Sequence, residues 1–201
     1  MKASPAREGS KGQEPHPGWS DKRLVRACLD GNDAAWSALI DKYKNLIYSI
    51  PFKYGASPED AADIFQAVCV ELFSELSKVR KTAALKGWII TVTAHQSYQW
   101  KRKHLKRLGH EQPDVDVGAR GADVAIPPDV ADEAEREQML RDATRRLPPR
   151  CQEMIRLLFY TEPPLPYREV ARRLGLATGS IGFIRGRCLQ RLQKMLRAMG
   201  F

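Results

Sequence analysis

The stretch that decides the fold is YREVARRLGLATGSIGFIRGRCL, residues 167–189, which has the pattern of two helices joined by a tight turn. Val170 and Leu174 recur at helical spacing, so the first helix has one apolar face. Gly175 permits the turn because glycine adopts positive φ without steric cost. Leu176 follows as an apolar plug between the two helices. This spacing predicts a helix-turn-helix, a motif whose second helix enters the major groove of DNA.

The second helix of this motif presents cationic and polar side chains away from its apolar face. Its N-terminal amides and arginines are suited to phosphates and base edges in a major groove. The ordinary alternative is a helical hairpin with a solvated basic face. The side chains on the outward face are Phe183, Arg185, Arg187, Gln190 and Arg191.

Charge is segregated along the chain. The 201 residues contain 33 Lys and Arg against 24 Asp and Glu, for a formal net charge of +9. Residues 77–107 carry nine basic and no acidic residues, and residues 141–201 carry 13 basic and four acidic. Residues 108–140 between them carry two basic and nine acidic. Clustered cations release counterions from phosphates, so this distribution favours a nucleic-acid partner over a merely soluble basic surface.

Nearly every patterned segment outside the motif also has helical period. We therefore predict an all-α fold of two small helical domains joined by a flexible acidic linker. The expected organisation is a disordered tail at 1–19, a domain at 20–107, a linker at 108–131 and a second domain at 132–201. The predicted helices begin at about Asp21, Asp33, Pro58, Ala84, Ala131 and Pro149, and two more span Tyr167–Leu174 and Thr178–Met199.

Several classes of protein are excluded or disfavoured. No uncharged apolar run approaches the roughly 20 residues of a membrane helix, so we expect no membrane insertion. Met1–Gly18 lacks the apolar core of a secretory signal, and we expect a cytoplasmic protein. No coiled-coil heptads persist, which favours a monomer when the protein is free.

Sequence features of enzymes and metal sites are also missing. The cysteines are far apart with no CxxC pair, and we interpret them as buried free thiols in a reducing cytosol. Neither they nor the histidines have metal-ligand spacing, and no phosphate-binding glycine loop or nucleophile elbow occurs. We expect no catalytic residue, no metal and no cofactor. The residues concerned are Cys28, Cys69, Cys151, Cys188, His16, His95, His104 and His110.

Residues 20–201 as a whole resemble a bacterial RNA polymerase sigma factor of the sigma-70 family, of the extracytoplasmic-function (ECF) type. LPPRCQEM, residues 147–154, together with the helix-turn-helix, is similar to the family's region 4. AADIFQAV, residues 61–68, resembles the region 2.2 helix, and KGWI, residues 86–89, with the basic helix after it resembles regions 2.3 and 2.4. The order and spacing of these segments make the resemblance strong. It implies a transcription initiation factor, without enzymatic activity, that directs core RNA polymerase to promoters.

The resemblance assigns partners to particular surfaces. In the family, the region 2.2 helix docks on the β′ clamp helices, and region 4 binds the β flap and the −35 element. By physics alone the corresponding helix face here is an ordinary solvent face. The polymerase-binding residues implied are Asp60, Asp63, Ile64, Gln66 and Glu71. An anti-sigma protein is a further partner that the resemblance admits.

Regions 2.3 and 2.4 melt and read the −10 element in the family, and the residues present suit single-stranded DNA. Cations attract the backbone, and aromatic side chains hold unstacked bases. Trp88 lies on the apolar stripe and is expected in the core, whereas Tyr98 and Trp100 are candidates for stacking. The predicted −10 residues are Lys78, Arg80, Lys81, Lys86, His95, Gln96, Tyr98, Gln99, Trp100, Lys101, Arg102 and Lys103.

The recognition helix departs from the family pattern. Gly182, Phe183 and Ile184 stand where many relatives have polar or basic base readers. Phe183 either touches thymine methyl groups or packs against the protein, and the sequence does not decide between these. The predicted −35 residues are Arg172, Ser180, Phe183, Arg185, Arg187, Gln190 and Arg191.

Two functional alternatives and one open role remain at this level. The first alternative to an active sigma factor is a stand-alone helix-turn-helix regulator, which would not need the basic segment 78–103. The second is a sigma-like decoy that binds polymerase without promoter activity, for which the altered recognition helix would be the sign. The acidic linker is either a plain tether or a segment that mimics nucleic acid in the basic channels of polymerase.

Overall fold

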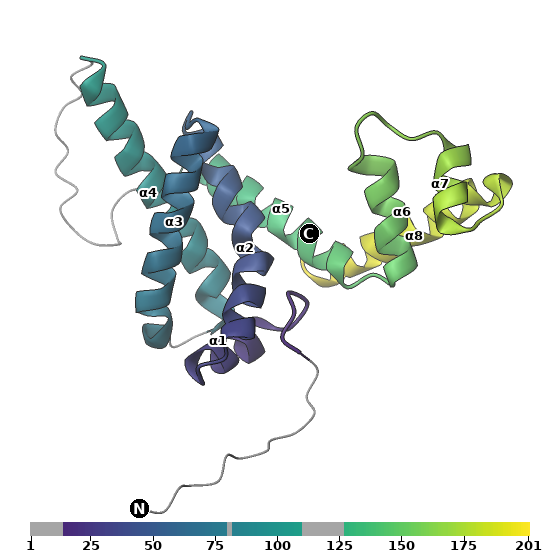
Figure 1. Ribbon diagram of the computed structural model, residues 1–201, viewed down its shortest axis with the longest axis horizontal. Coiled ribbons are helices and arrows are strands. Elements are labelled where there is room, and N and C mark those ends of the chain that lie inside the picture. Colours follow the sequence, from purple (N-terminus) through teal and green to yellow (C-terminus); the bar gives the residue numbers. More distant parts are fainter. Residues whose placement is uncertain (1–13, 80–81, 110–126) are drawn as a thin grey trace, which may run out of the picture.

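The computed structural model describes residues 14–79, 82–109 and 127–201, and every regular element within these ranges is helical (Figure 1). The predicted all-α class is thus confirmed. Short 3-10 turns occur at Leu76–Lys78, Thr82–Ala84 and Thr178–Ser180. The α-helices are α1 (Asp21–Leu29), α2 (Asp33–Lys53), α3 (Pro58–Glu75), α4 (Leu85–Arg107), α5 (Pro128–Arg145), α6 (Pro149–Phe159), α7 (Tyr167–Leu174) and α8 (Ile181–Ala198).

Local capping signals set most helix boundaries. The Ser57 hydroxyl accepts a hydrogen bond from the Asp60 amide at 3.2 Å, and Pro58 takes the first helical position of α3, as predicted. Asn32, rather than Asp33, caps α2 by accepting from the Ala35 amide at 3.0 Å. Gly175 ends α7 with φ of +62°. Each boundary therefore has a side chain or a backbone conformation that satisfies the unpaired end of the helix.

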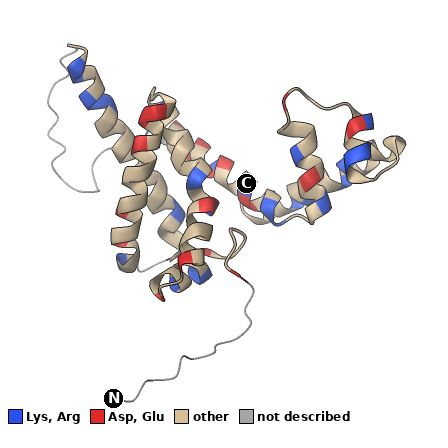
Figure 2. Cartoon of the chain, viewed as in Figure 1, with Lys and Arg blue, Asp and Glu red and all other residues tan. Residues whose placement is uncertain are grey.

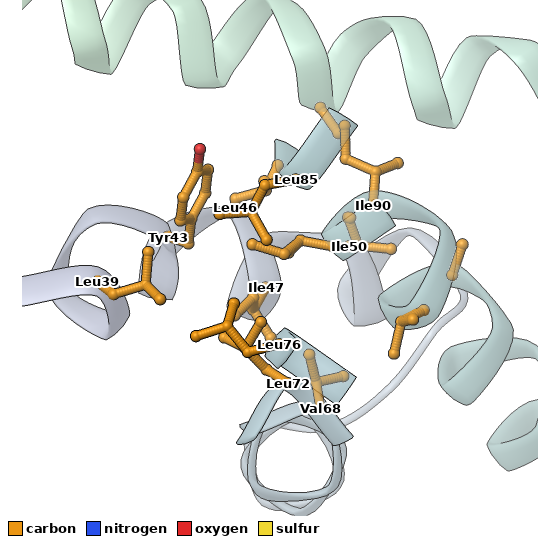
Figure 3. Packing of buried hydrophobic residues seen from close by; sticks show 14 of the residues in the cluster. Leu39, Tyr43, Leu46, Ile47, Ile50, Val68, Leu72, Leu76, Leu85 and Ile90 are labelled. Atoms are coloured by element: carbon orange, nitrogen blue, oxygen red, sulfur yellow. The ribbon is translucent and has the colours of Figure 1, made fainter. Parts of the chain in front are cut away.

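Helices α1 to α4 form a bundle around one apolar core (Figure 3). Leu46, Ile47 and Ile50 of α2 are fully buried between α3 and α4. Full burial of one such side chain stabilises a fold by about 1.5–3 kcal/mol. Helix α2 contributes several of them and contacts α1, α3 and α4, so it is the central helix of this bundle. Trp88 packs partly buried against the same core, in agreement with its predicted role.

The C-terminal helices enclose two smaller cores. One joins α5, α6 and α8 around Leu147, Ile155 and Leu192. The other joins α6, α7 and the start of α8 around Met154, Val170 and other buried residues. Ile184 packs against both clusters, so the recognition helix is anchored on two sides.

The cysteine prediction is wrong for one pair. Cys151 of α6 and Cys188 of α8 form a disulfide, with Cα atoms 5.4 Å apart, whereas Cys28 and Cys69 are free thiols. Helical spacing cannot show that these two positions on separate helices face each other. The Cα separation is within the range of native disulfides.

Helix α5 connects the two parts of the molecule. It begins at Pro128, three residues before the predicted start, so residues 128–131 of the expected linker are helical, and residues 110–126 lie outside the described residues. Val130 and Ala134 near its N-terminus pack into the bundle core, and Ala143 near its C-terminus packs with α6 and α8. No helix within the described ranges is long and apolar enough to cross a bilayer.

Candidate nucleic-acid and polymerase interface

The exposed face of α3 carries part of the predicted polymerase-binding set. Asp63 and Gln66 are exposed and one turn apart, as a docking face requires. Asp60 is turned toward the helix start, where its carboxylate accepts a 2.7 Å hydrogen bond from the Ser57 hydroxyl. This bond and a second one from the Trp100 side chain hold the pKa of Asp60 below its usual value. Ile64 is 5 % exposed and belongs to the core, so it is not available to a partner.

Two exposed apolar side chains on α3 were not among the predicted site residues. Val70 and Phe73 are 70 % and 69 % exposed, and with Asp63 and Gln66 they follow one helical stripe. Phe73 lies 5.1 Å from the ring of Trp36 on α2. Contiguous apolar groups beside a few polar ones are typical of protein-binding surfaces. Helical spacing from Asp63 could have found this stripe.

The basic segment is displayed mainly along α4, whose C-terminal part extends beyond the bundle and carries a cluster of cations (Figure 2). Lys101 and Lys103 are exposed there. Trp100 stacks on His104 with ring centroids 5.1 Å apart, and Trp100 and Tyr98 both pack partly against the core. Their rings are therefore only half available to a base. Arg80 and Lys81 lie outside the described residues.

Several predicted −10 residues have partners within the chain. Lys86 forms an ion pair with Glu135 of α5, with 2.5 Å between Nζ and Oε1. Gln96 donates to the Glu71 carboxylate at 3.0 Å, which joins one predicted −10 residue to one predicted polymerase-binding residue. Three further predicted residues also have neighbours in the chain: Lys78 pairs with Glu75 at 2.8 Å, and Gln99 lies 3.4 Å from His95.

The helix-turn-helix places one predicted −35 residue, Arg172, on α7, a second, Ser180, in the 3-10 turn before α8, and the other five on α8. Arg172 makes a two-pronged pair with Glu169, at 2.9 and 2.7 Å. Hydrogen bonds from Arg172 and Arg173 lower the pKa of Glu169 to about 2. Glu169 is therefore ionised at neutral pH. The stabilisation that its carboxylate gives to these pairs is lost only as the pH falls from the ordinary pKa of a glutamate toward 2. Ser180 donates to the Ala177 carbonyl at 2.7 Å and so stabilises the turn before α8.

Side chains on the outward face of α8 have defined orientations. Arg185 donates to the Tyr167 hydroxyl at 2.7 Å, and Arg187 lies 5.4 Å from the Phe183 ring centroid. Phe183 is 68 % exposed, so of the two alternatives for this residue the structure excludes burial against the protein. Gln190 and Arg191 are exposed one turn further along. Tyr167 was not predicted, although an aromatic residue at the first position of α7 was a visible signal.

The outward side of α8 is also open around its glycines. A Cβ atom added at Gly182 or Gly186 would meet nothing within 4 Å. The backbone of the recognition helix is therefore accessible on this side, beside Arg185 and Arg187. Within the described ranges, no group of three or more His, Cys, Asp or Glu side chains is placed to hold a metal ion.

Comparison with known proteins gives three findings. A family model for sigma-70 region 2 matches residues 39–107, the span that contains α3, α4 and most of α2. The ECF RNA polymerase sigma-E factor of Haemophilus influenzae is 21% identical over 168 residues, which cover 81% of this chain and 87% of that protein. A chain of a solved RsbN–BldN complex aligns with a TM-score of 0.33 and 21% identity over 85% of this chain and 98% of that chain.

Proposed function

We propose that this chain, which belongs to the sigma-70 family and to its ECF group, directs core RNA polymerase to promoters by recognising and melting the −10 element and binding the −35 element. Membership in this family makes it a transcription initiation factor that has no enzymatic activity of its own. Its partners are accordingly RNA polymerase and promoter DNA.

The observation that carries the proposal is the coincidence of the region 2 match with two adjacent surfaces. Residues 39–107 include both the α3 stripe of Asp63, Gln66, Val70 and Phe73 and the cationic end of α4. A duplex-binding regulator would need neither surface. A factor that opens DNA on polymerase needs a protein-docking face and a neighbouring face that prefers single strands.

The three surfaces have complementary tasks. The α3 stripe docks on the β′ clamp helices, where Val70 and Phe73 supply apolar contact and Asp63 and Gln66 supply polar specificity. The α4 cations hold the −10 strand by its phosphates. Arg185 and Arg187 of α8 reach phosphates and base edges of the −35 duplex. Each contact needs only moderate strength, because joined sites bind with avidity.

Gel filtration with bacterial core RNA polymerase, without DNA, tests the docking face. We expect the wild-type chain to co-elute with polymerase at moderate salt. The double variant Asp63→Arg with Gln66→Ala loses this complex while its circular dichroism spectrum is unchanged. Asp132→Arg, an equal change of charge at an exposed site on α5, serves as the matched control and keeps the complex.

The outcomes separate the candidate functions. No complex between polymerase and the folded wild-type chain would overturn the proposal in favour of a stand-alone DNA-binding regulator. A complex that the double variant also forms would move the docking site away from α3. A complex that never supports promoter opening would identify a decoy.

A further inference from the structure

An aromatic side chain stands at the centre of the outward face of the recognition helix. Phe183 belongs to the first turn of α8 and is 68 % exposed. The helical period places it on the side of α8 opposite the buried Cys188 and Leu192. Its ring therefore meets water in the free chain and gains free energy from a partner that covers it.

The charges around Phe183 favour DNA as this partner. Residues 181–198 contain five Lys and Arg and no Asp or Glu. Arg187, Gln190 and Lys194 are exposed and follow Phe183 along one stripe of the helix. An apolar ring among cations and an amide suits the major groove, where the phosphates border base edges of mixed polarity.

The ring of Phe183 is oriented within the chain. The Arg187 guanidinium carbon lies over this ring, 5.4 Å from its centroid, which is within the range of a cation–π contact. The contact restricts both side chains while both stay exposed. Less rotamer freedom is then lost when DNA is bound, because the ring and the cation are already arranged.

The neighbours of Phe183 on the helix surface leave room around the ring. Gly182 precedes it and Gly186 follows one turn later, and a Cβ atom added at either would meet nothing within 4 Å. Internal packing therefore does not require glycine at these two positions, although glycine is unfavourable inside a helix. The absence of side chains there lets a base edge approach Phe183 closely.

We propose that Phe183 is a specificity-determining residue of the −35 contact, which selects thymine by covering its 5-methyl group. Thymine is the base that presents a methyl group in the major groove. A phenyl ring offers no hydrogen bond, so the polar edge of a G·C pair would lose water there without gaining a partner. The inference rests on the proposed function, because it requires that α8 enters the −35 duplex.

Replacement of thymine by uracil tests this inference, because uracil lacks the 5-methyl group and keeps the same base pairing. The full chain, in complex with core RNA polymerase, first selects duplexes from a pool with a randomised centre. The most enriched duplex is then synthesised with uracil at each thymine in turn, and competition binding compares each product with its parent. Phe183→Ala is measured beside wild type, and Phe159→Ala makes the same exchange at an exposed site on α6 as the matched control.

We expect uracil at one or two adjacent positions to weaken wild-type binding about fourfold, the factor that burial of one methyl group supplies. Phe183→Ala loses this difference between thymine and uracil, whereas Phe159→Ala keeps it. The difference is a sharper readout than affinity alone. A merely structural role of Phe183 would weaken binding of both duplexes equally and leave their ratio unchanged.

The contrary outcomes are distinct. If wild type binds the thymine and uracil duplexes equally at every position, or if Phe183→Ala keeps every preference of the wild type, the inference is overturned and the proposed function stands. Failure of the complex to enrich any duplex sequence beyond core polymerase alone would overturn the proposed promoter function and this inference with it.

Discussion

Arg185 shows how one side chain of the recognition helix is prepared for an anionic partner. Its guanidinium donates to the Tyr167 hydroxyl at 2.7 Å and lies 5.9 Å from the centroid of the same ring. This contact restricts the side chain while leaving it exposed. Less rotamer entropy is then lost when a phosphate is bound. The residue is therefore the most direct test of α8 as a DNA-binding surface.

Replacement of Arg185 by Ala should weaken duplex binding and reduce its salt dependence. One lost phosphate contact lowers the slope of log affinity against log salt by about 0.9. Fluorescence anisotropy with a mixed-sequence duplex over a range of salt concentrations measures this slope. Arg197→Ala, at an exposed cation near the C-terminal end of the same helix, should change it less. Identical slopes for the two variants would remove Arg185 from the DNA-binding face.

At this scale the sequence predicted the type of residue better than its surroundings. Asp63 and Gln66 are exposed as expected, but Ile64 between them is buried. Phe73 is exposed because α3 has more apolar positions than the bundle covers. Glu135 could not be recognised as the partner of Lys86, since only the packing of α5 brings them together. Contacts between distant segments depend on tertiary structure, which helical periodicity does not encode.

Among the elements, helices with local stop and start signals were predicted best. The bounds of α7 agree with the predicted Tyr167–Leu174, because Pro166 precedes it and Gly175 ends it. The start of α5 was less well predicted, since Pro127 and Pro128 suggested a loop while Pro128 in fact takes the first helical position. The disulfide between α6 and α8 had no local signal at all.

The bond between α6 and α8 should make the stability of the helix-turn-helix depend on reduction. It closes a loop with a sequence separation of 37 residues, for which loop entropy gives about 4 kcal/mol, and measured disulfides usually contribute about 2–4. We therefore expect a reductant to lower the free energy of unfolding by about 2–4 kcal/mol in urea titrations followed by circular dichroism. Because Cys151 and Cys188 are both buried, we expect the reductant to reach the disulfide rapidly only after partial denaturation.

The double variant Cys151→Ala with Cys188→Ala controls for reduction of other groups. It should match the reduced wild-type chain in stability and show no response to the reductant, although Cys28 and Cys69 remain. A wild-type unfolding midpoint that does not move on full reduction would show that the bond contributes nothing to the fold.

For the whole molecule, α5 decides how its two functional parts are related. One end of this helix is buried in the bundle and the other packs on α8, so the single element sets the distance between the proposed −10 and −35 surfaces. One acidic residue of the segment 108–140 faces a cation of the basic segment in the folded chain, in the Glu135–Lys86 pair.

If its hydrogen bonds to α2 hold α5 on the bundle, their removal should expand the chain without any DNA present. The double variant Gln138→Ala with Arg145→Ala loses three side-chain hydrogen bonds to the carbonyls of Asp41 and Lys42, each worth about 1 kcal/mol. Small-angle X-ray scattering should then give a larger radius of gyration and maximum dimension, with helix content preserved by circular dichroism. Arg146→Ala, at an exposed neighbouring site, should scatter like the wild-type chain. A double variant as compact as the wild type would mean that the ion pairs and apolar contacts of α5 suffice, and that these hydrogen bonds do not control the position of α5.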